Sequence, residues 1–141
     1  MASRSLAFIV KDQNPLILAA SQTVQHACKR MCERGVGAVL VTDDKHHHLA
    51  GIFTGRDAVR ALTEGKNPAA TALSAVMTAK PDTITPEQTA IDALRAMRDG
   101  GYRHLPIVEH GKILGIVSRG DFKGLELDRL EDETHLWERI G

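Results

Sequence analysis

One short pattern that brings a hydroxyl and a carboxylate together occurs twice in the sequence. It consists of a Gly, two apolar residues, a Ser or Thr, two spacers and an Asp, at residues 51–57 and 115–121. Each copy follows a short apolar run and opens a helix-like stretch, so its hydroxyl and carboxylate should lie beside free backbone N–H groups. The alternative is structural, with Thr54 or Ser118 as an N-cap and the Asp completing a capping-box variant.

The two motifs belong to a longer internal repeat. Residues 15–41 align without gaps with residues 81–107, and the register returns at the motifs after two extra residues in the first copy. Apolar residues recur at i, i+3, i+4 and i+7 in both copies, which predicts a helix with one buried face. These positions are Val24, Ala27, Cys28 and Met31, and Ala90, Ala93, Leu94 and Met97.

Each copy predicts the order β-α-β-β-α, and hence a mixed α/β (α+β) fold. A single copy of about 50 residues is too short to bury a sheet face alone, so the two copies should pack sheet to sheet. Glycine at residue 35 and at residues 100–101 favours left-handed helix C-caps. The second helix should begin at Thr85, followed by Pro86 and a capping-box Gln88, whereas Ala19 offers the first helix no such cap. Each copy begins with a short extended segment, at residues 16–18 and at residues 83–85. The strands predicted after the first helix of each copy are residues 36–42 and 49–53, and residues 103–108 and 113–117.

Composition narrows the classes of function. The chain has 141 residues, 43% of them hydrophobic, with 18 basic and 18 acidic residues. This balance argues against nucleic acid or an anionic membrane as partner. No apolar run of about 18 residues is present to span a membrane, and the N-terminal apolar run is too short for a signal peptide. Cys28 and Cys32 are spaced i, i+4, a poor disulfide, so a reducing cytoplasm is the expected compartment.

The ordered motifs resemble a tandem pair of CBS domains, a Bateman module. The resemblance covers residues 5–127 and rests on Val-Met-Thr at 76–78, Leu-Pro-Ile-Val at 105–108 and the repeated motif. It implies two units related by a pseudo-twofold axis, clefts between them that bind adenosine nucleotides, and dimerisation through helices. The implied organisation is a first repeat at 5–65 with its lead-in, a linker at 66–80 with a short helix, a second repeat at 81–127, and an acidic amphipathic helical tail at 128–141.

The resemblance also implies a set of ligand-binding residues. The motif Asp would hold ribose hydroxyls in bidentate fashion, with the motif hydroxyl beside it. Basic side chains within the motifs and at the start of the second repeat's middle strand would contact phosphates. The carried-over residues are Thr54 with Asp57, Ser118 with Asp121, and Arg56, Arg119, Arg103 and His104. The first repeat has Gly37 and Ala38 where the second has Arg103 and His104, so the two sites should differ. For Arg103 and His104 the alternative to phosphate binding is an exposed strand face.

The remaining candidates are weaker. Ile52, Ile116, Thr83 and Ile84 could wall an adenine slot, although ordinary core packing explains each one as well. The histidines at 46–48 lie on a predicted turn and cannot all face one ion, so a solvated turn is favoured over a metal site. No nucleophile–base pair or catalytic motif is visible, which argues against an enzyme.

The sequence therefore predicts a cytoplasmic regulatory module that binds AMP, ADP or ATP, forms a homodimer and signals to a protein effector by changing conformation. No obligatory cofactor or metal is expected. Two alternatives stay open. One is a ligand-free structural or interaction module that binds through its tail, and the other is an accessory subunit of a partner enzyme or transporter.

Overall fold

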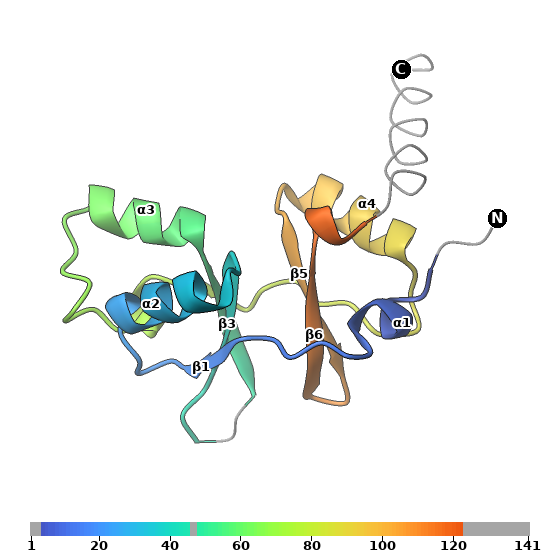
Figure 1. Ribbon diagram of the computed structural model, residues 1–141, viewed down its shortest axis with the longest axis horizontal. Coiled ribbons are helices and arrows are strands. Elements are labelled where there is room, and N and C mark those ends of the chain that lie inside the picture. The colour runs from blue at the N-terminus through green and yellow to red at the C-terminus, as the bar shows by residue number, and fades with distance from the viewer. Residues whose placement is uncertain (1–3, 46–47, 123–141) are drawn as a thin grey trace, which may run out of the picture. The chain divides into compact units, whose positions relative to one another are not determined.

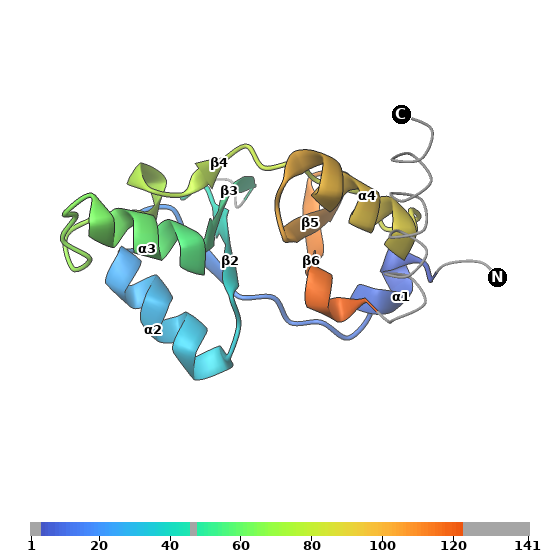
Figure 2. The ribbon, with the colours of Figure 1, turned by 90° about the horizontal axis from the view of Figure 1, so that it is seen from above.

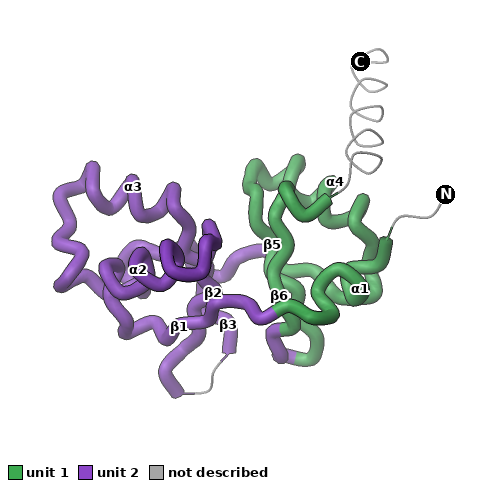
Figure 3. Tube along the Cα trace, in the orientation of Figure 1, with its two compact units in different colours: residues 1–13, 83–110, 114–141 green, residues 14–82, 111–113 purple. Residues whose placement is uncertain are grey.

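A computed structural model describes residues 4–45 and 48–122 of the chain, which form two compact units (Figure 3). Unit 2 comprises residues 14–82 and 111–113, and it holds the first repeat. Unit 1 comprises the described parts of residues 1–13, 83–110 and 114–141, and it holds the second repeat. The predicted tail at 128–141 lies outside the described residues.

Unit 2 is built on a four-stranded sheet in the order β1-β2-β3-β4 (Figure 1). β1 and β2 pair in parallel, and β3 pairs antiparallel with both of its neighbours. The first three strands confirm the predicted extended segments, whereas β4 falls in the predicted linker and was not expected. The strands are β1 Ile17–Ala19, β2 Ala38–Thr42, β3 Leu49–Thr54 and β4 Thr78–Ala79.

Two helices, α2 (Val24–Arg34) and α3 (Gly55–Thr63), cover the same face of this sheet (Figure 2). Strand residues alternate between faces, so Val39, Val41 and Phe53 pack with the helices while Leu40 and Ile52 lie on the opposite face. The short helix predicted in the linker is present as the 3-10 turn η1 (Leu73–Ala75). The core of unit 2 consists of Leu16, Val24, Ala27, Met31, Val39, Val41, Phe53, Ala61, Leu73 and Val76.

Unit 1 contains a smaller sheet of two strands, β5 (His104–Glu109) and β6 (Lys112–Ser118), beside helix α4 (Ala90–Gly100). The strands are joined by His110 and Gly111, whose φ angles of 51° and 77° are those of a type I′ hairpin turn. The extended segment predicted at 83–85 is reduced to one parallel bridge between Ile84 and Ile107.

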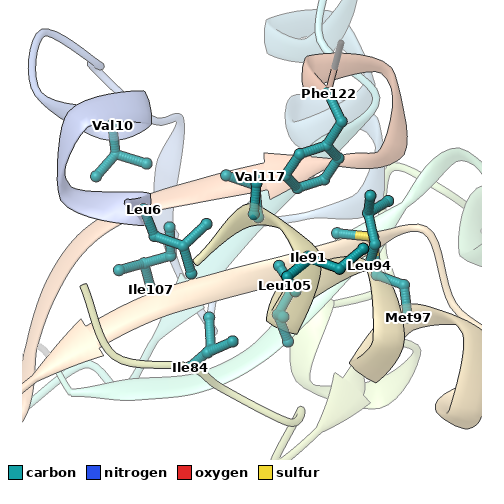
Figure 4. Packing of buried hydrophobic residues seen from close by; sticks show 12 residues of the cluster. Leu6, Val10, Ile84, Ile91, Leu94, Met97, Leu105, Ile107, Val117 and Phe122 are labelled. Carbon is teal, nitrogen blue, oxygen red and sulfur yellow. The ribbon is translucent and has the colours of Figure 1, made fainter. Parts of the chain in front are cut away.

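The N-terminal helix α1 (Leu6–Val10) belongs to the core of unit 1 (Figure 4). Leu6 and Val10 pack there against residues of α4, β5 and β6. Residues 5–13 were grouped with the first repeat by sequence order, but they pack with the second. The core consists of Leu6, Val10, Ile84, Ala90, Ile91, Ala93, Leu94, Met97, Leu105, Ile107, Val117 and Phe122.

The predicted helix starts were wrong in both repeats. α2 and α4 begin after Thr23 and Thr89, and each Thr hydroxyl accepts from the backbone N–H three residues on. Thr85 closes a separate turn instead, because its N–H and hydroxyl both donate to the side chain of Gln88. Each helix begins after the Thr that directly precedes the first buried residue of its apolar face. A helix that began earlier would add residues that do not pack against the core. The predicted left-handed C-caps are present at Gly35 and Gly101.

In each unit, one strand, β3 or β6, is covered along its side by a segment that precedes the other repeat in the chain. Residues 77–80, the first closing segment, run along β3, and a methyl group added to Gly51 would lie 2.5 Å from the sulfur of Met77. Residues 10–13, the second closing segment, run along β6, where a methyl group on Gly115 would lie 2.6 Å from Oε1 of Gln13. The first glycine of each motif is therefore required for close approach.

Candidate functional site

The first motif lies where β3 ends and α3 begins. Thr54 is the N-cap of α3, and its hydroxyl accepts from the N–H of Asp57 at 3.4 Å. Oδ2 of Asp57 accepts in return from the Thr54 N–H at 2.9 Å and from the Thr54 hydroxyl at 3.2 Å. These reciprocal bonds form a capping box, the structural role weighed against ligand binding.

The carboxylate of Asp57 is buried and its second oxygen is also occupied. The side chain of Asp57 is 5% exposed. Its Oδ1 accepts a hydrogen bond from Nη2 of Arg60 at 2.7 Å, and the same nitrogen approaches the carbonyl oxygen of Val76 at 3.3 Å. Both carboxylate oxygens therefore already have partners within unit 2.

The second motif lies where β6 ends in the 3-10 turn η2 (Arg119–Asp121). Oδ2 of Asp121 accepts from the Ser118 N–H at 2.7 Å and from the Ser118 hydroxyl at 3.3 Å. Asp121 is exposed, and within residues 4–45 and 48–122 nothing hydrogen-bonds to its Oδ1. The helix predicted after Ser118 is a single described turn, because residues 123–127 lie outside the described part of the chain. Asp121 thus offers an oxygen that Asp57 does not.

Basic side chains gather beside the second motif. The N–H of Arg119 donates to the carbonyl of Arg103 at 3.0 Å, which places the start of β5 next to the end of β6. Nη2 of Arg4 donates to the backbone carbonyl of Asp121 at 3.2 Å. Arg103 is exposed, whereas Arg119 and His104 are half-buried. An anionic group on a ligand at Asp121 would therefore meet cationic side chains.

His104 responds electrostatically to this cluster. Burial lowers its pKa below the ordinary value, and the positive charge of Arg103 lowers it further. The carboxylate of Asp121 opposes both effects by raising the pKa. His104 is therefore close enough to feel both charges, and its proton would report on any further anion bound beside them.

The first motif has a different electrostatic setting. Gly55 N–H donates to Gly37 O at 3.2 Å, the same bond that Arg119 and Arg103 make in unit 1. Gly37 and the buried Ala38 provide no charge there, and Arg56 is exposed on the first turn of α3. The two motifs thus share backbone geometry and differ in the side chains around them.

The apolar candidates fall into two groups. Ile84 is a member of the unit 1 core, so the packing alternative describes it (Figure 4). Ile52 is buried on the face of its sheet opposite Phe53, and Ile116 is half-buried and alternates with the core residue Val117. Thr83 is exposed. Ile52 and Ile116 occupy matching strand positions, one residue after the close-approach glycine.

Three residues that sequence reasoning missed contact these motifs. Arg60 pairs with Asp57, Arg4 donates to Asp121, and Gln13 accepts from the N–H of Ile116 at 2.6 Å. Arg60 could have been found from its position three residues after Asp57, a helical ion-pair spacing. Nothing in the sequence pairs residue 4 with a turn 117 positions away, or residue 13 with a strand 103 positions away.

Two other kinds of site were sought. No group of three or more His, Cys, Asp or Glu side chains within residues 4–45 and 48–122 could hold a metal ion. In the same part of the chain, no helix is both long and apolar enough to cross a bilayer.

Comparison with known proteins shows what kind of fold carries these motifs. The chain is 43% identical over 103 residues to the CBS domain-containing protein CBSCBSPB2 of Arabidopsis thaliana; the match covers 72% of this chain and spans 19% of that protein's length. Its fold matches the CBS domain protein PAE2072 of Pyrobaculum aerophilum, solved with AMP, with a TM-score of 0.82, 19% identity and coverage of 91% and 98% of the two chains.

A second fold match is the CBS domain pair of protein MJ0100, solved with 5′-methylthioadenosine and S-adenosyl-L-methionine. Its TM-score is 0.77 at 19% identity, over 94% of this chain and 99% of that one. The family model for the CBS domain matches residues 9–64 and again residues 73–127, so each match contains one of the two motifs. With both repeats matched and the motif at the same place in each, the chain belongs to the CBS-domain family as a tandem pair.

Proposed function

We propose that this chain is a regulatory module that binds an adenine nucleotide at its second motif. The observation that carries the proposal is the exposed carboxylate of Asp121, which has one oxygen held by Ser118 and one without a hydrogen-bond partner among the described residues. A vicinal diol needs such an acceptor. The carboxylate is held in place by the strand end, so little conformational freedom is lost on binding.

The choice of an adenosine ligand draws on the fold relatives. PAE2072 was solved with AMP and MJ0100 with 5′-methylthioadenosine and S-adenosyl-L-methionine, and all three ligands contain adenosine. AMP, ADP and ATP add phosphates, which Arg103, Arg119 and His104 would neutralise. The proposed ligand is therefore an adenine nucleotide, and its phosphate distinguishes it from a neutral nucleoside.

Binding would regulate rather than catalyse. A ligand shifts a conformational equilibrium by its difference in affinity for the two states, and a protein effector would read that shift. The proposal includes a homodimer, because Val59 and Leu62 are 60% and 63% exposed on one face of α3. Sedimentation velocity should show a dimer at micromolar concentration that Leu62→Glu weakens, and a wild-type monomer would contradict this part.

The alternative of a ligand-free structural module has one observation in its favour. Asp57 and Thr54 form a complete capping box, and the carboxylate is closed by Arg60. A purely structural reading of the first motif is therefore sufficient for the apo chain. Ser118 and Asp121 also form a capping box. Asp121, however, is exposed and keeps an oxygen without a hydrogen-bond partner among the described residues.

The test is a calorimetric titration of the full chain with AMP, 5′-methylthioadenosine and S-adenosyl-L-methionine. Asp121→Ala should weaken binding by about 1.5–3 kcal/mol, the value of hydrogen bonds to a charged group. Asp92→Ala is the matched control, because Asp92 completes the capping box of α4 in the same unit and lies outside both motifs. Absence of binding by all three ligands would overturn the proposal.

A further inference from the structure

We infer that Arg60 closes the first motif to ribose by occupying the carboxylate of Asp57, so that the chain takes up nucleotide at the second motif alone. The inference rests on the proposed function, because it concerns which of two equivalent motifs is open. It assigns Arg60 a specific role as the residue that selects between the sites.

A carboxylate has about four lone-pair sites, and three of those on Asp57 are taken, so too few remain for the two hydroxyls of a diol. Oδ2 receives both the N–H and the hydroxyl of Thr54, and Oδ1 receives Nη2 of Arg60 at 2.7 Å. A ribose would have to displace the guanidinium. That exchange replaces a contact between two charged groups with a hydrogen bond from a neutral hydroxyl, at a carboxylate whose side chain is 5% exposed.

Among the described residues, no side chain closes Oδ1 of Asp121 in this way. The residue three places after Asp57 is Arg60, and the residue three places after Asp121 in the sequence is Gly124. A glycine has no charged side chain, so this sequence position supplies no counterpart of Arg60. The two motifs match in their hydroxyl and their Asp, and among their differences this position agrees with the difference in carboxylate occupancy.

Arg60 is also held from a second direction. Its Nη2 approaches the carbonyl oxygen of Val76 at 3.3 Å, just before the first closing segment. The guanidinium therefore bridges α3 and the chain that leads to β4. The Arg60 side chain is 52% exposed, and the two acceptors on separate segments hold its guanidinium at Asp57.

A similar constellation in α4 shows what a helical cap looks like without this closure. Asp92 is boxed with Thr89 as Asp57 is with Thr54, and Arg95 follows at the same spacing. The ion pair there is longer, 3.7 Å, and the Asp92 side chain is 36% exposed. A capping-box Asp can therefore keep an exposed carboxylate. Arg95 provides a matched control for Arg60.

The experiment counts AMP molecules bound per full-length chain by isothermal titration calorimetry. The wild type should bind a single equivalent that Asp121→Ala removes. Arg60→Met should add a second equivalent, and Asp57→Asn placed in that variant should remove it again. Arg60→Lys keeps a cation near Asp57 and should retain the wild-type stoichiometry, as should the control Arg95→Met. Circular dichroism establishes that each variant is folded.

The outcomes separate this inference from the proposed function. If Arg60→Met still binds a single equivalent through Asp121, the role of Arg60 is wrong and the proposed function stands. The same holds if the wild type binds two equivalents, one dependent on each Asp. If the wild type binds a single equivalent that Asp57→Asn removes and Asp121→Ala does not, both the role of Arg60 and the Asp121 assignment are wrong. If only Arg60→Met binds AMP, through Asp57, Arg60 closes the first motif and the Asp121 assignment fails. Absence of AMP binding in wild type and Arg60→Met overturns both.

Discussion

The side-chain carbonyl of Gln13 accepts a hydrogen bond from the backbone N–H of Ile116 at 2.6 Å, across 103 positions of sequence. A side chain thereby satisfies a strand N–H of β6 that a neighbouring strand would otherwise take. The contact fits because Gly115 has no Cβ, since a methyl group there would lie 2.6 Å from the same oxygen and 2.9 Å from Cβ of Val10.

Substituting Gly115 tests this close approach. Gly115→Ala should lower the free energy of unfolding by about 1–3 kcal/mol, the usual cost of overpacking, because the second closing segment must move away from β6. Urea denaturation followed by circular dichroism measures the change. Gly55→Ala is the control, since a methyl group at Gly55 meets no atom within 4 Å and should leave the stability equal or higher. Equal effects of the two substitutions would contradict the contact.

Proton uptake on AMP binding should report on His104. Its pKa in the folded chain is lowered by burial and by Arg103, against the opposing charge of Asp121. A bound phosphate favours the imidazolium and raises this pKa, so binding near pH 6 should draw in a proton. Calorimetry in buffers of different ionisation enthalpy measures the uptake. His104→Gln should remove the proton uptake that is due to His104 and leave the part that is due to the AMP phosphate. Equal proton uptake by the wild type and the variant would exclude His104 from the site.

The same lowered pKa makes a prediction about stability without ligand. The unfolded chain titrates His104 near its ordinary value of about 6.5, so just below that pH the unfolded state binds more protons than the folded state. The free energy of unfolding should therefore fall as the pH is lowered through this range. His104→Gln should make this pH dependence shallower, and an unchanged slope would contradict the burial of the imidazole.

Arg103 should recognise phosphate and act together with Asp121. Arg103→Ala should weaken AMP by on the order of 1 kcal/mol, because the contact is partly screened by solvent, and should leave adenosine unaffected. A double-mutant cycle with Asp121→Asn should show a coupling energy that a cycle with Asp57→Asn lacks. Lys112→Ala at the opposite end of β6 controls for general charge loss. Equal weakening of AMP and adenosine would mean that Arg103 acts through structure.

The two thiols on α2 should differ in reactivity. The pKa of Cys28 is raised by burial and by the neighbouring Cys32, and its side chain is half-buried, whereas Cys32 is exposed. The thiolate is the nucleophile, so iodoacetamide at pH 8 should alkylate Cys32 before Cys28. Peptide mass spectrometry over time gives both rates from one sample, and faster alkylation of Cys28 would contradict its placement against the core.

Much of the fold could be predicted from the repeat. Apolar residues at helical spacing found α2 and α4, the glycines at 35 and 101 marked their ends, and three strands of unit 2 follow the predicted runs. These patterns depend only on residues close together in the sequence, and the apolar residues that they place on one helix face are found in the two cores. Where two local signals competed, as between Thr85 and Thr89, packing decided the helix start, which propensity alone could not.

The rest depends on contacts between distant residues. β4 and α1 have short, weak patterns, and each is stabilised by a strand or core elsewhere in its unit. The candidate site divides in the same way. Its hydroxyls and carboxylates could be read from the repeated motif, but which carboxylate stays open depends on Arg60 and on burial, and neither is visible in the motif itself.

The closing segments have a consequence for how such a chain can be cut or inherited. Residues 10–13 close β6 and residues 77–80 close β3, so each segment lies next to one repeat in sequence and serves the other. A fragment excised at the sequence boundary of the second repeat would lose Leu6 and Val10 from its core and Gln13 from its edge. The pair is therefore the smallest piece that duplication or recombination can move intact, although each half repeats the other.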